Sequence, residues 1–192
     1  MLDLASLYQE QADRVHPSTT AAVVREESGG DFLAIGVNGA GGGRRRASSF
    51  EQACEFATAL IRSGRSVDMG LMQINWSAGH LQRRGLSICD AFKPRINIRV
   101  GTEILQENYA GCRQRDQRAC LVEALSKYNA GTATGGVRNG YVGKVMGNPP
   151  LTHAVSINTP RVVPPRPRRP QEIVVEAGPE WQAAVAMTLG GR

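Results

Sequence analysis

The chain has 192 residues, 41% of them hydrophobic, which is enough for one folded domain and a tail. Aromatic residues make up only 5%, so we expect a mostly aliphatic core, and the formal net charge of +6 favours a polyanionic partner. No stretch approaches the roughly 20 apolar residues of a membrane span. No helix-turn-helix, zinc spacing or aromatic RNA-binding motif points to nucleic acid. A cell wall bearing anionic groups suits the charge equally well.

The N-terminal segment has no basic stretch followed by an apolar core, so the sequence as written shows no secretory signal. Residues 3–14 are predicted to form a helix because apolar side chains recur near one face. These side chains are Leu4, Leu7, Tyr8 and Ala12.

A second helix is predicted from Pro17 to Ser28, with hydroxyl side chains at its start and a glycine pair after its end. Helical spacing puts Glu27 on the same face as Val23 and Val24, and Glu26 about 100° away. If the valines pack inward, Glu27 lies at the edge of an apolar core. Such surroundings favour the uncharged carboxyl that a general acid needs. The alternative is an ordinary solvated glutamate near a helix end.

Residues 31–49 are predicted to be a loop. Its glycine-rich part, 38–43, and the three arginines that follow form a surface loop rather than a phosphate site, because no G-K-[ST] follows. An amphipathic helix is expected from Phe50 to Arg62. Its inward positions are Phe50, Cys54, Ala57 and Ile61.

The segment from Asp68 to Asn75 is predicted to be a tight, partly extended turn that enters a cleft. The amides of Gln73 and Asn75 offer donors and acceptors to a sugar. Asp68 either forms the turn or serves as a second carboxylate. The aliphatic side chains of this segment are expected in the core: Leu71 and Ile74.

The rest of the domain is predicted to be helical with connectors. We expect a connector over 81–95, helices over 97–109, 121–128 and 141–146, and a loop over 132–140. Gly101 within the first of these helices indicates a close contact.

Four cysteines allow two disulfides with three possible connectivities, or four buried thiols in a reducing compartment. None sits in a C-x-x-C pair, and the chain has three histidines, so a structural zinc site is not expected. The cysteines are Cys54, Cys89, Cys112 and Cys120. The last two are close enough in sequence to close a short loop.

The composition changes after Gly147, because seven of the ten prolines lie between Pro149 and Pro170 among several arginines. Such a segment favours polyproline conformations and builds no core. We therefore predict a folded domain over residues 1–147 and a disordered Pro/Arg-rich tail over 148–192. A weak helix is expected over 180–189 when the tail binds a partner.

Four short segments stand in an order that resembles the lytic transglycosylases of the lysozyme-like superfamily. They are Val23–Gly30, Asp68–Asn75, Ser126–Gly131 and Tyr141–Val145. The likeness is strongest to the small transglycosylases of type IV secretion and conjugative transfer systems, and it covers roughly residues 15–146. It implies a mainly α, lysozyme-like fold of the goose-lysozyme or SLT type.

The resemblance also implies roles for single residues. Glu27 would be the only catalytic acid and base, oriented by Ser28 and contacted by the hydroxyl of Tyr141. The residues expected at the glycan are Met72, Gln73, Asn75, Tyr128 and Asn129. For the last two a structural role stays open, because Tyr128 also lies on an apolar helical stripe and Asn129 stands near a helix end.

The implied reaction is non-hydrolytic cleavage of the MurNAc–GlcNAc bond of peptidoglycan with a 1,6-anhydro product, without metal or cofactor. The implied partners are glycan strands and, through the tail, components of a secretion channel, and the implied location is the periplasm. Two alternatives stay open. One is a lysozyme-type hydrolase in which Asp68 positions water. The other is a non-catalytic protein that binds the wall during assembly.

Overall fold

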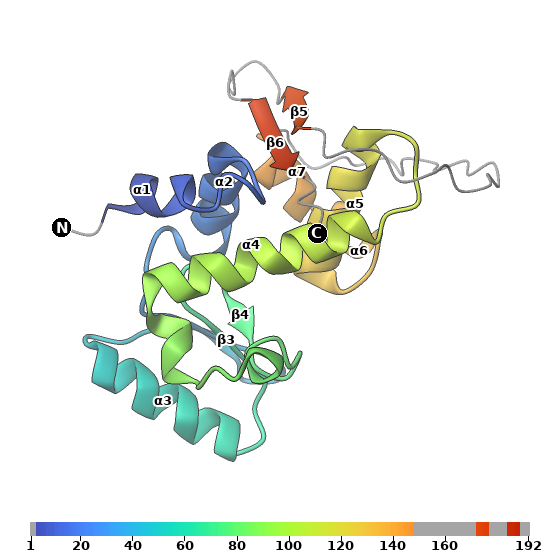
Figure 1. Ribbon diagram of the computed structural model, residues 1–192. Helices are drawn as coiled ribbons and strands as arrows, with labels where there is room; N and C mark the ends of the chain where they lie inside the picture. Colours follow the sequence, from blue (N-terminus) through green and yellow to red (C-terminus); the bar gives the residue numbers. More distant parts are fainter. Residues whose placement is uncertain (1–2, 148–171, 177–183, 189–192) are drawn as a thin grey trace. The chain divides into compact units, whose positions relative to one another are not determined.

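The computed structural model describes residues 3–147, 172–176 and 184–188 (Figure 1). The chain groups into two compact units. The first comprises Met1–Leu7 and Val23–Thr102, and the second comprises Tyr8–Ala22 and Glu103–Arg192. Within the described ranges, no helix combines the length and the apolar character needed to cross a bilayer.

The first unit contains a four-stranded antiparallel sheet with the strand order β2-β1-β3-β4. The strands are β1 Ala34–Val37, β2 Gly43–Arg46, β3 Val67–Met69 and β4 Ile74–Asn75. Side chains alternate between the two faces of a sheet. One face is apolar and buried, and it consists of Ile35, Val37, Val67, Met69 and Ile74. The other face is therefore the polar one.

The prediction of a loop over residues 31–49 was wrong, because β1 and β2 form a hairpin there. The turn is closed by the Gly42 N–H, which donates to the Gly39 carbonyl at 2.9 Å. Arg65 supports the turn by donating to the carbonyls of Asn38 and Ala40. In β1 the aliphatic Ile35 and Val37 alternate with the small Ala34 and Gly36, and this alternation in the sequence was a strand signal. Three consecutive arginines in β2 lack the usual strand composition.

Helix α2, Pro17–Ser28, and helix α3, Phe50–Arg62, have the predicted bounds. Ser49 caps α3 because its side chain accepts from the backbone N–H of Gln52. Helix α1, Leu4–Gln9, is shorter than the predicted helix. The predicted connector over 81–95 contains two 3₁₀ turns, η1 Gln82–Arg84 and η2 Cys89–Phe92. The disulfide Cys54–Cys89 joins η2 to α3.

Helix α4, Pro94–Ala110, begins three residues before the predicted start at residue 97. Proline suits the first position of a helix, because its missing N–H has no intrahelical partner there in any case. The predicted close approach at Gly101 is present, since the side chain of Met72 occupies the space that a Cβ would need. Met72 and Gly101 are both buried.

The second unit carries α5, Gln117–Ala130, α6, Gly135–Arg138, and α7, Tyr141–Val145. Asp116 caps α5 by accepting from the Arg118 N–H, so α5 begins four residues before the predicted start. Part of the predicted loop over 132–140 is helical. A disulfide joins Cys112 to Cys120 and closes the short loop before α5.

Most of the predicted tail lies outside the described residues. Two segments inside it form an antiparallel hairpin of β5, Glu172–Glu176, and β6, Ala184–Thr188, with Ile173 opposite Met187. In the chain alone, Ala184–Thr188 is thus a strand, and the helix expected over 180–189 on binding a partner stays a prediction. Both strands contain valine, whose branched side chain favours extended backbone.

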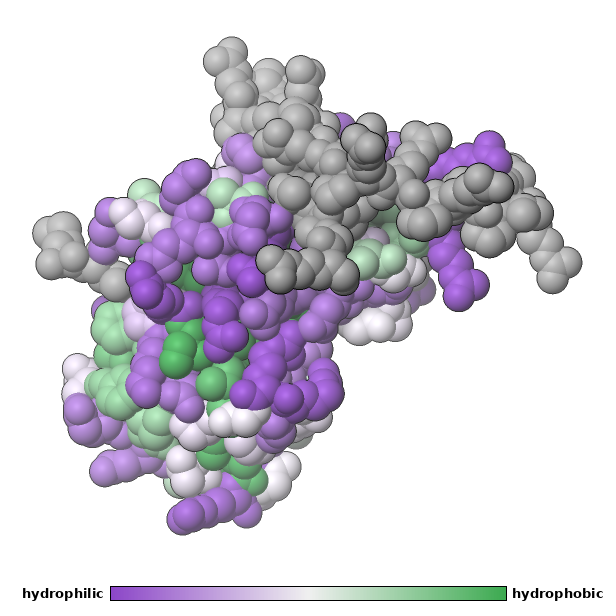
Figure 2. Space-filling view, in the orientation of Figure 1, coloured by the Kyte–Doolittle hydropathy of each residue, from purple (hydrophilic) through white to green (hydrophobic). Residues whose placement is uncertain are grey.

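The core of the described residues is mostly aliphatic, as the low aromatic content predicted. Its largest fully buried side chains include only one aromatic ring, that of Phe92, among the residues described. Figure 2 shows a largely hydrophilic visible surface with smaller hydrophobic areas between the polar side chains. Phe56 is the large hydrophobic side chain with the most exposure in the described ranges, at 46%.

Candidate functional site

Helix α2 places Glu27 in its last turn, half-buried, on the face that carries Val23 and Val24. Both valines are at most 1% exposed, so the predicted inward packing of this face is confirmed. The helix ends at Ser28, and the next two residues are glycines with positive φ of 66° and 86°. Glu27 thus sits at the edge of an apolar core, at a sharply defined helix end.

The hydroxyl of Ser28 contributes to this helix end. Its Oγ donates to the Val24 carbonyl at 3.2 Å and accepts from the Gly30 N–H at 3.2 Å. These bonds satisfy backbone groups that a helix terminus leaves without partners. Ser28 therefore holds the backbone next to Glu27. Direct orientation of the carboxyl by Ser28 stays a prediction.

Strand β2 is attached to the same helix end through its arginines. Arg44 donates to the Glu26 carbonyl at 3.2 Å, and Arg46 pairs with Asp31 at 3.0 Å. A cation near the C-terminus of a helix interacts favourably with the helix dipole. The arginine-rich stretch that the sequence places in a surface loop is thus a strand edge beside the segment that carries Glu27.

Gln73 has the only positive φ among the described non-glycine residues, at 48°. Its side-chain Nε2 donates to the carbonyls of Ala34 at 3.2 Å and Gly70 at 2.9 Å. Such a backbone conformation costs about 1 kcal/mol or more and persists only where the surroundings enforce it. Strain of this kind concentrates at functional sites, so Gln73 is a strong candidate for contact with a ligand.

Gly36 makes room for the Gln73 amide. A Cβ at Gly36 would stand 2.8 Å from Gln73 Oε1 and 3.3 Å from Asp68. Real Cβ atoms do not approach an oxygen so closely, so the glycine sets where the amide can lie. Gln73 is therefore fixed by the backbone of β1 on one side and by its own turn on the other.

Asp68 and Asn75 face each other across β3 and β4, and both bind within the protein. Asp68 Oδ1 accepts from Asn75 Nδ2 at 2.6 Å, and Oδ2 accepts from Asn38 Nδ2 at 2.7 Å. Asn75 Nδ2 also donates to Ser66 Oγ, and Asn75 Oδ1 accepts from the Ala78 N–H. The arrangement favours the turn-forming role for Asp68. Contact of Asn75 with a glycan stays a prediction.

Met72 is fully buried and its backbone N–H donates to Asn97 Oδ1 at 2.7 Å. Asn97 Nδ2 donates to the carbonyls of Met69 at 2.8 Å and Ala91 at 2.7 Å. This buried amide therefore fixes the turn between β3 and β4. Because Met72 is fully buried against Gly101 and Asn97, contact of its side chain with a glycan stays a prediction.

In the second unit, Tyr128 is half-buried and Asn129 is exposed in the last turn of α5. Asn129 Oδ1 accepts from Asn139 Nδ2 at 2.7 Å, and Asn139 Oδ1 accepts from the Tyr141 N–H at 3.0 Å. Tyr141 is 6% exposed at the start of α7. The motif residues Asn129 and Tyr141 are thus linked through a residue that the sequence analysis did not single out.

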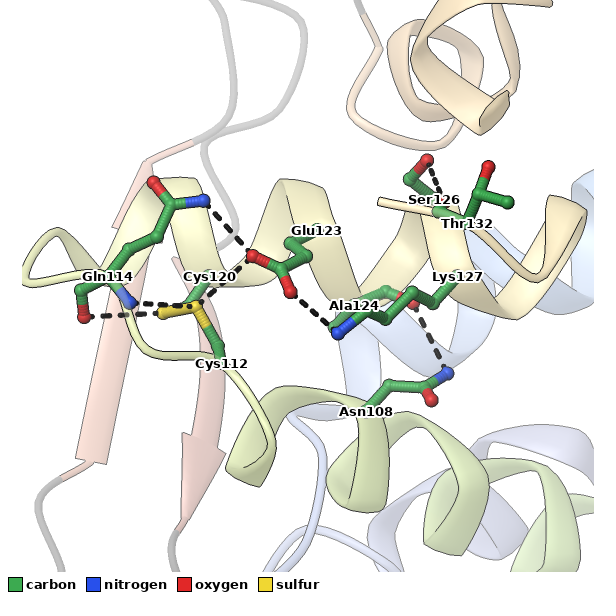
Figure 3. A network of polar contacts seen from close by, with 9 residues as sticks. All are labelled: Asn108, Cys112, Gln114, Cys120, Glu123, Ala124, Ser126, Lys127 and Thr132. Carbon is green, nitrogen blue, oxygen red and sulfur yellow. Dashed lines mark hydrogen bonds and ion pairs between the residues drawn. A yellow bond between two sulfur atoms is a disulfide. The ribbon is translucent and has the colours of Figure 1, made fainter. Parts of the chain in front are cut away.

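A buried serine shapes the same region. Ser126 Oγ donates to the Thr132 carbonyl at 2.8 Å and accepts from the Gly136 N–H at 2.9 Å. Figure 3 shows the Ser126–Thr132 contact and, one turn earlier in α5, the side chain of Glu123. The serine ties the segment after α5 back to the helix that carries Tyr128 and Asn129.

Glu123 is the centre of the polar network in Figure 3 and accepts from Lys127 Nζ at 2.6 Å and Gln114 Nε2 at 3.0 Å. Burial acts to raise the pKa of Glu123, but the hydrogen bonds from Lys127 and Gln114 and the charge of Lys127 hold that pKa below its usual value. The network supports the disulfide-closed loop before α5. It gives Glu123 a structural role.

Sequence reasoning missed three residues that position the predicted site: Arg44, Asn97 and Asn139. Asn97 gave no signal of this role, because it stood at the predicted helix start, where asparagine is a common capping residue. Arg44 and Asn139 carry no such signal. Their partners are defined by strand pairing and by a turn between two helices.

Comparison with known proteins places the chain in a family. A protein-family model described as "Transglycosylase SLT domain" matches residues 5–147. "Type IV secretion system protein virB1" of Brucella abortus biovar 1 (strain 9-941) is 32% identical over 172 residues, which cover 84% of this chain and 70% of that protein. "Protein virB1" of Agrobacterium fabrum (strain C58 / ATCC 33970) is 32% identical over 173 residues, 90% of this chain and 65% of that protein. No solved structure matches the chain. The chain therefore belongs to the transglycosylase SLT-domain family, as a lytic transglycosylase with a lysozyme-like fold that acts on peptidoglycan.

Proposed function

We propose that this chain cleaves the β-1,4 bond between MurNAc and GlcNAc without water, and so opens the cell wall locally for a type IV secretion or conjugation apparatus. The name of the Brucella relative, a type IV secretion system protein, supports this setting. Such an enzyme works outside the cytoplasm, where the wall lies. An oxidising compartment also suits the two disulfides.

In the proposed reaction, Glu27 is the only proton carrier. Its carboxyl donates a proton to the bridging oxygen as the bond from the anomeric carbon to that oxygen breaks. The carbonyl oxygen of the substrate's own N-acetyl group bonds to the anomeric carbon and holds the positive charge that develops there. The C6 hydroxyl then displaces that oxygen and returns its proton to Glu27. The product is a 1,6-anhydro ring, and Glu27 ends in the protonation state in which it began.

The observation that carries this proposal is the state of Asp68. A hydrolase needs a second carboxylate to activate water or to act as nucleophile. Asp68 is the carboxylate that the shared motifs offer for this task, and both of its oxygens accept from side-chain amides, those of Asn75 and Asn38. A carboxylate held in this way supports a lyase better than a hydrolase.

The other site residues take supporting parts. Gln73 and Asn75 contact the glycan, with Met72 beneath them, and Ser28 holds the helix end next to Glu27. For the second-unit residues Tyr128, Asn129 and Tyr141, the proposed roles at the glycan and the catalytic carboxyl are those that the matching motifs imply. These assignments rest on the matching motifs and on the local geometry of each unit.

Mass spectrometry of purified sacculi digested with the full chain tests the reaction. We expect muropeptides that end in 1,6-anhydro-MurNAc, and a hydrolytic muramidase run in parallel provides the reducing-end reference. Reducing MurNAc ends as the main product would favour the hydrolase. Unimpaired biological function of a Glu27→Gln chain would favour the non-catalytic wall-binding role.

A further inference from the structure

The polar face of the first unit's sheet carries one row of residues that crosses all four strands. The register places Arg44 opposite Gly36, Gly36 opposite Asp68, and Asp68 opposite Asn75. Residues directly opposite each other in a sheet point to the same face. Neighbouring strands lie about 4.8 Å apart, so Arg44 and Asp68 start about 10 Å apart on one surface.

This row is polarised. Its β2 end carries a guanidinium and its β3 end carries a carboxylate, and the bare position of Gly36 between them is occupied by the amide of Gln73. A glycan that lies over Gln73 therefore meets positive charge on one side and negative charge on the other. An anionic substituent on that glycan is attracted to the Arg44 end and repelled from the Asp68 end.

Arg44 is exposed and is held beside the proposed catalytic residue. Among the described residues, its guanidinium makes one hydrogen bond, to the carbonyl of Glu26 at 3.2 Å. Glu26 directly precedes Glu27, so this contact fixes the guanidinium near the end of α2. The guanidinium has five N–H donors in a fork that matches a carboxylate, so further donors remain for a ligand.

The two neighbouring arginines differ in their positions. Arg46 pairs with Asp31 at 3.0 Å, so its charge is already matched. Arg45 pairs in register with Ile35, on the opposite face of the sheet from Arg44. Of the three arginines in β2, Arg44 is thus the one that the fold directs to the polar face with donors to spare.

We propose that Arg44 determines specificity by binding a carboxylate on the lactyl–peptide arm of the muramoyl residue, and this rests on the proposed function. Peptidoglycan differs from neutral chitin-like polymers in that arm and in the carboxylates that it bears. Arg44 at one end of the row sets the direction in which the glycan lies over Gln73, with the arm pointing away from Asp68. Glu27 then meets the bond on the reducing side of MurNAc rather than that of GlcNAc.

Binding measurements on the full chain test this proposal independently of cleavage. The Glu27→Gln background keeps the strands intact, and the probes are soluble, uncrosslinked glycan strands with peptide stems and the same strands after carboxyl amidation. Isothermal titration should show that amidation weakens binding about fivefold. Adding Arg44→Gln should weaken binding to the unmodified strands by a similar factor and leave binding to the amidated strands unchanged. Strands stripped of their stems retain the lactyl carboxylate, and they show which part of the arm Arg44 contacts.

Arg45→Gln is the matched control, because it removes the same charge from the same strand on the other face. It should change binding to both probes by less than about twofold. Equal weakening by the Arg44 and Arg45 variants, or equal weakening of both probes by Arg44→Gln, would overturn the proposal and leave Arg44 as a cap of α2. The comparison of the two probes with Arg44 intact needs no substitution in β2, so equal affinities there would also overturn it. If wild-type protein failed to cleave the strands while this preference persisted, only the proposed function would fall.

Discussion

The side-chain amide of Asn139 donates to Oδ1 of Asn129 at 2.7 Å and so joins the residue after α6 to the last turn of α5. The other end of the same amide accepts the backbone N–H of Tyr141 at 3.0 Å. One side chain thus sets the position of two residues that belong to separate motifs. Positioning of this kind matters because small displacements in an active site reduce rates strongly.

We therefore expect Asn139→Ala to lower kcat/KM on peptidoglycan about tenfold. Asn139→Asp retains the acceptor for the Tyr141 N–H and loses the donor to Asn129, so it should recover part of the loss. Turnover of sacculi is measured for both Asn139 variants, for Asn129→Ala, and for the double variant that combines Asn129→Ala with Asn139→Ala. The departure of the double variant from additivity gives the coupling between the two asparagines. Full additivity of Asn129→Ala and Asn139→Ala would contradict the link.

Gly36→Ala should displace the amide of Gln73, because the new Cβ would stand 2.8 Å from Gln73 Oε1. The expected result is about a tenfold fall in kcat/KM, with a destabilisation of about 1 kcal/mol from crowding. Gly111→Ala is the matched control, since its Cβ would meet its nearest neighbours at an ordinary 3.5 Å and 3.7 Å. Measuring kcat/KM for Gly36→Ala, Gly111→Ala and Gln73→Ala tests this prediction. A Gly36→Ala protein with full activity would refute the position assigned to the Gln73 amide.

Asn97→Ala should destabilise the protein by about 3 kcal/mol, because it leaves one buried N–H and two buried carbonyls without their partners. Asn108→Ala, in the same helix, removes one long bond of 3.5 Å to the Ala124 carbonyl and should cost less than about 1 kcal/mol. Urea unfolding of both variants measures the difference. Similar losses for the two asparagines would contradict the role given to Asn97.

Asp90 should make stability depend on pH in acid. Hydrogen bonds from Lys93 and Ser87 lower the pKa of Asp90 from 3.8 to about 2. Asp90 therefore binds a proton more tightly in the unfolded chain than in the folded one. Its contribution to the free energy of unfolding is complete above about pH 4 and is lost as the pH falls toward 2. Lys93 is 53% exposed, and solvent screening limits the effect to about 1 kcal/mol. Urea unfolding should show that the free energy of unfolding of wild type exceeds that of Asp90→Asn by an amount that shrinks as the pH falls across this window. A difference that does not change with pH would contradict the prediction.

Local patterns predicted much of the fold. The glycine pair after Ser28 located the end of α2, and the apolar spacing in Phe50–Arg62 located α3. The hydroxyl side chains expected to cap the start of α2 lie inside the helix instead, and the Ser18 N–H donates to His16 Nδ1 at 3.3 Å. Helix α4 was predicted to start late because the first turn holds Pro94 and Arg95, which carry no apolar period. The apolar spacing likewise gave no indication that Asp116 caps α5. Caps and first-turn residues are chosen by backbone hydrogen bonds rather than by burial.

The parts of the site that the sequence did not predict depend on long-range pairing. Three arginines in a row give no strand signal, and β2 exists because β1 offers it an edge of unpaired backbone groups. The amide of Asn97 meets partners up to 28 residues away. Such contacts follow from the assembled fold. The roles given to Glu27, Gln73, Tyr128 and the other site residues stay predictions, as does the domain boundary at residue 147.

Glu27 is the proposed sole proton carrier, and turnover of purified sacculi by Glu27→Gln beside Glu26→Gln tests this role most directly. The two changes are chemically identical and lie at adjacent positions on different faces of one helix. Glu27→Gln should lower the release of anhydro-muropeptides about 10³-fold, while Glu26→Gln should change it less than about twofold. A Glu27→Gln protein that retains more than about a tenth of wild-type turnover, with unfolding behaviour like that of wild type, would contradict the account.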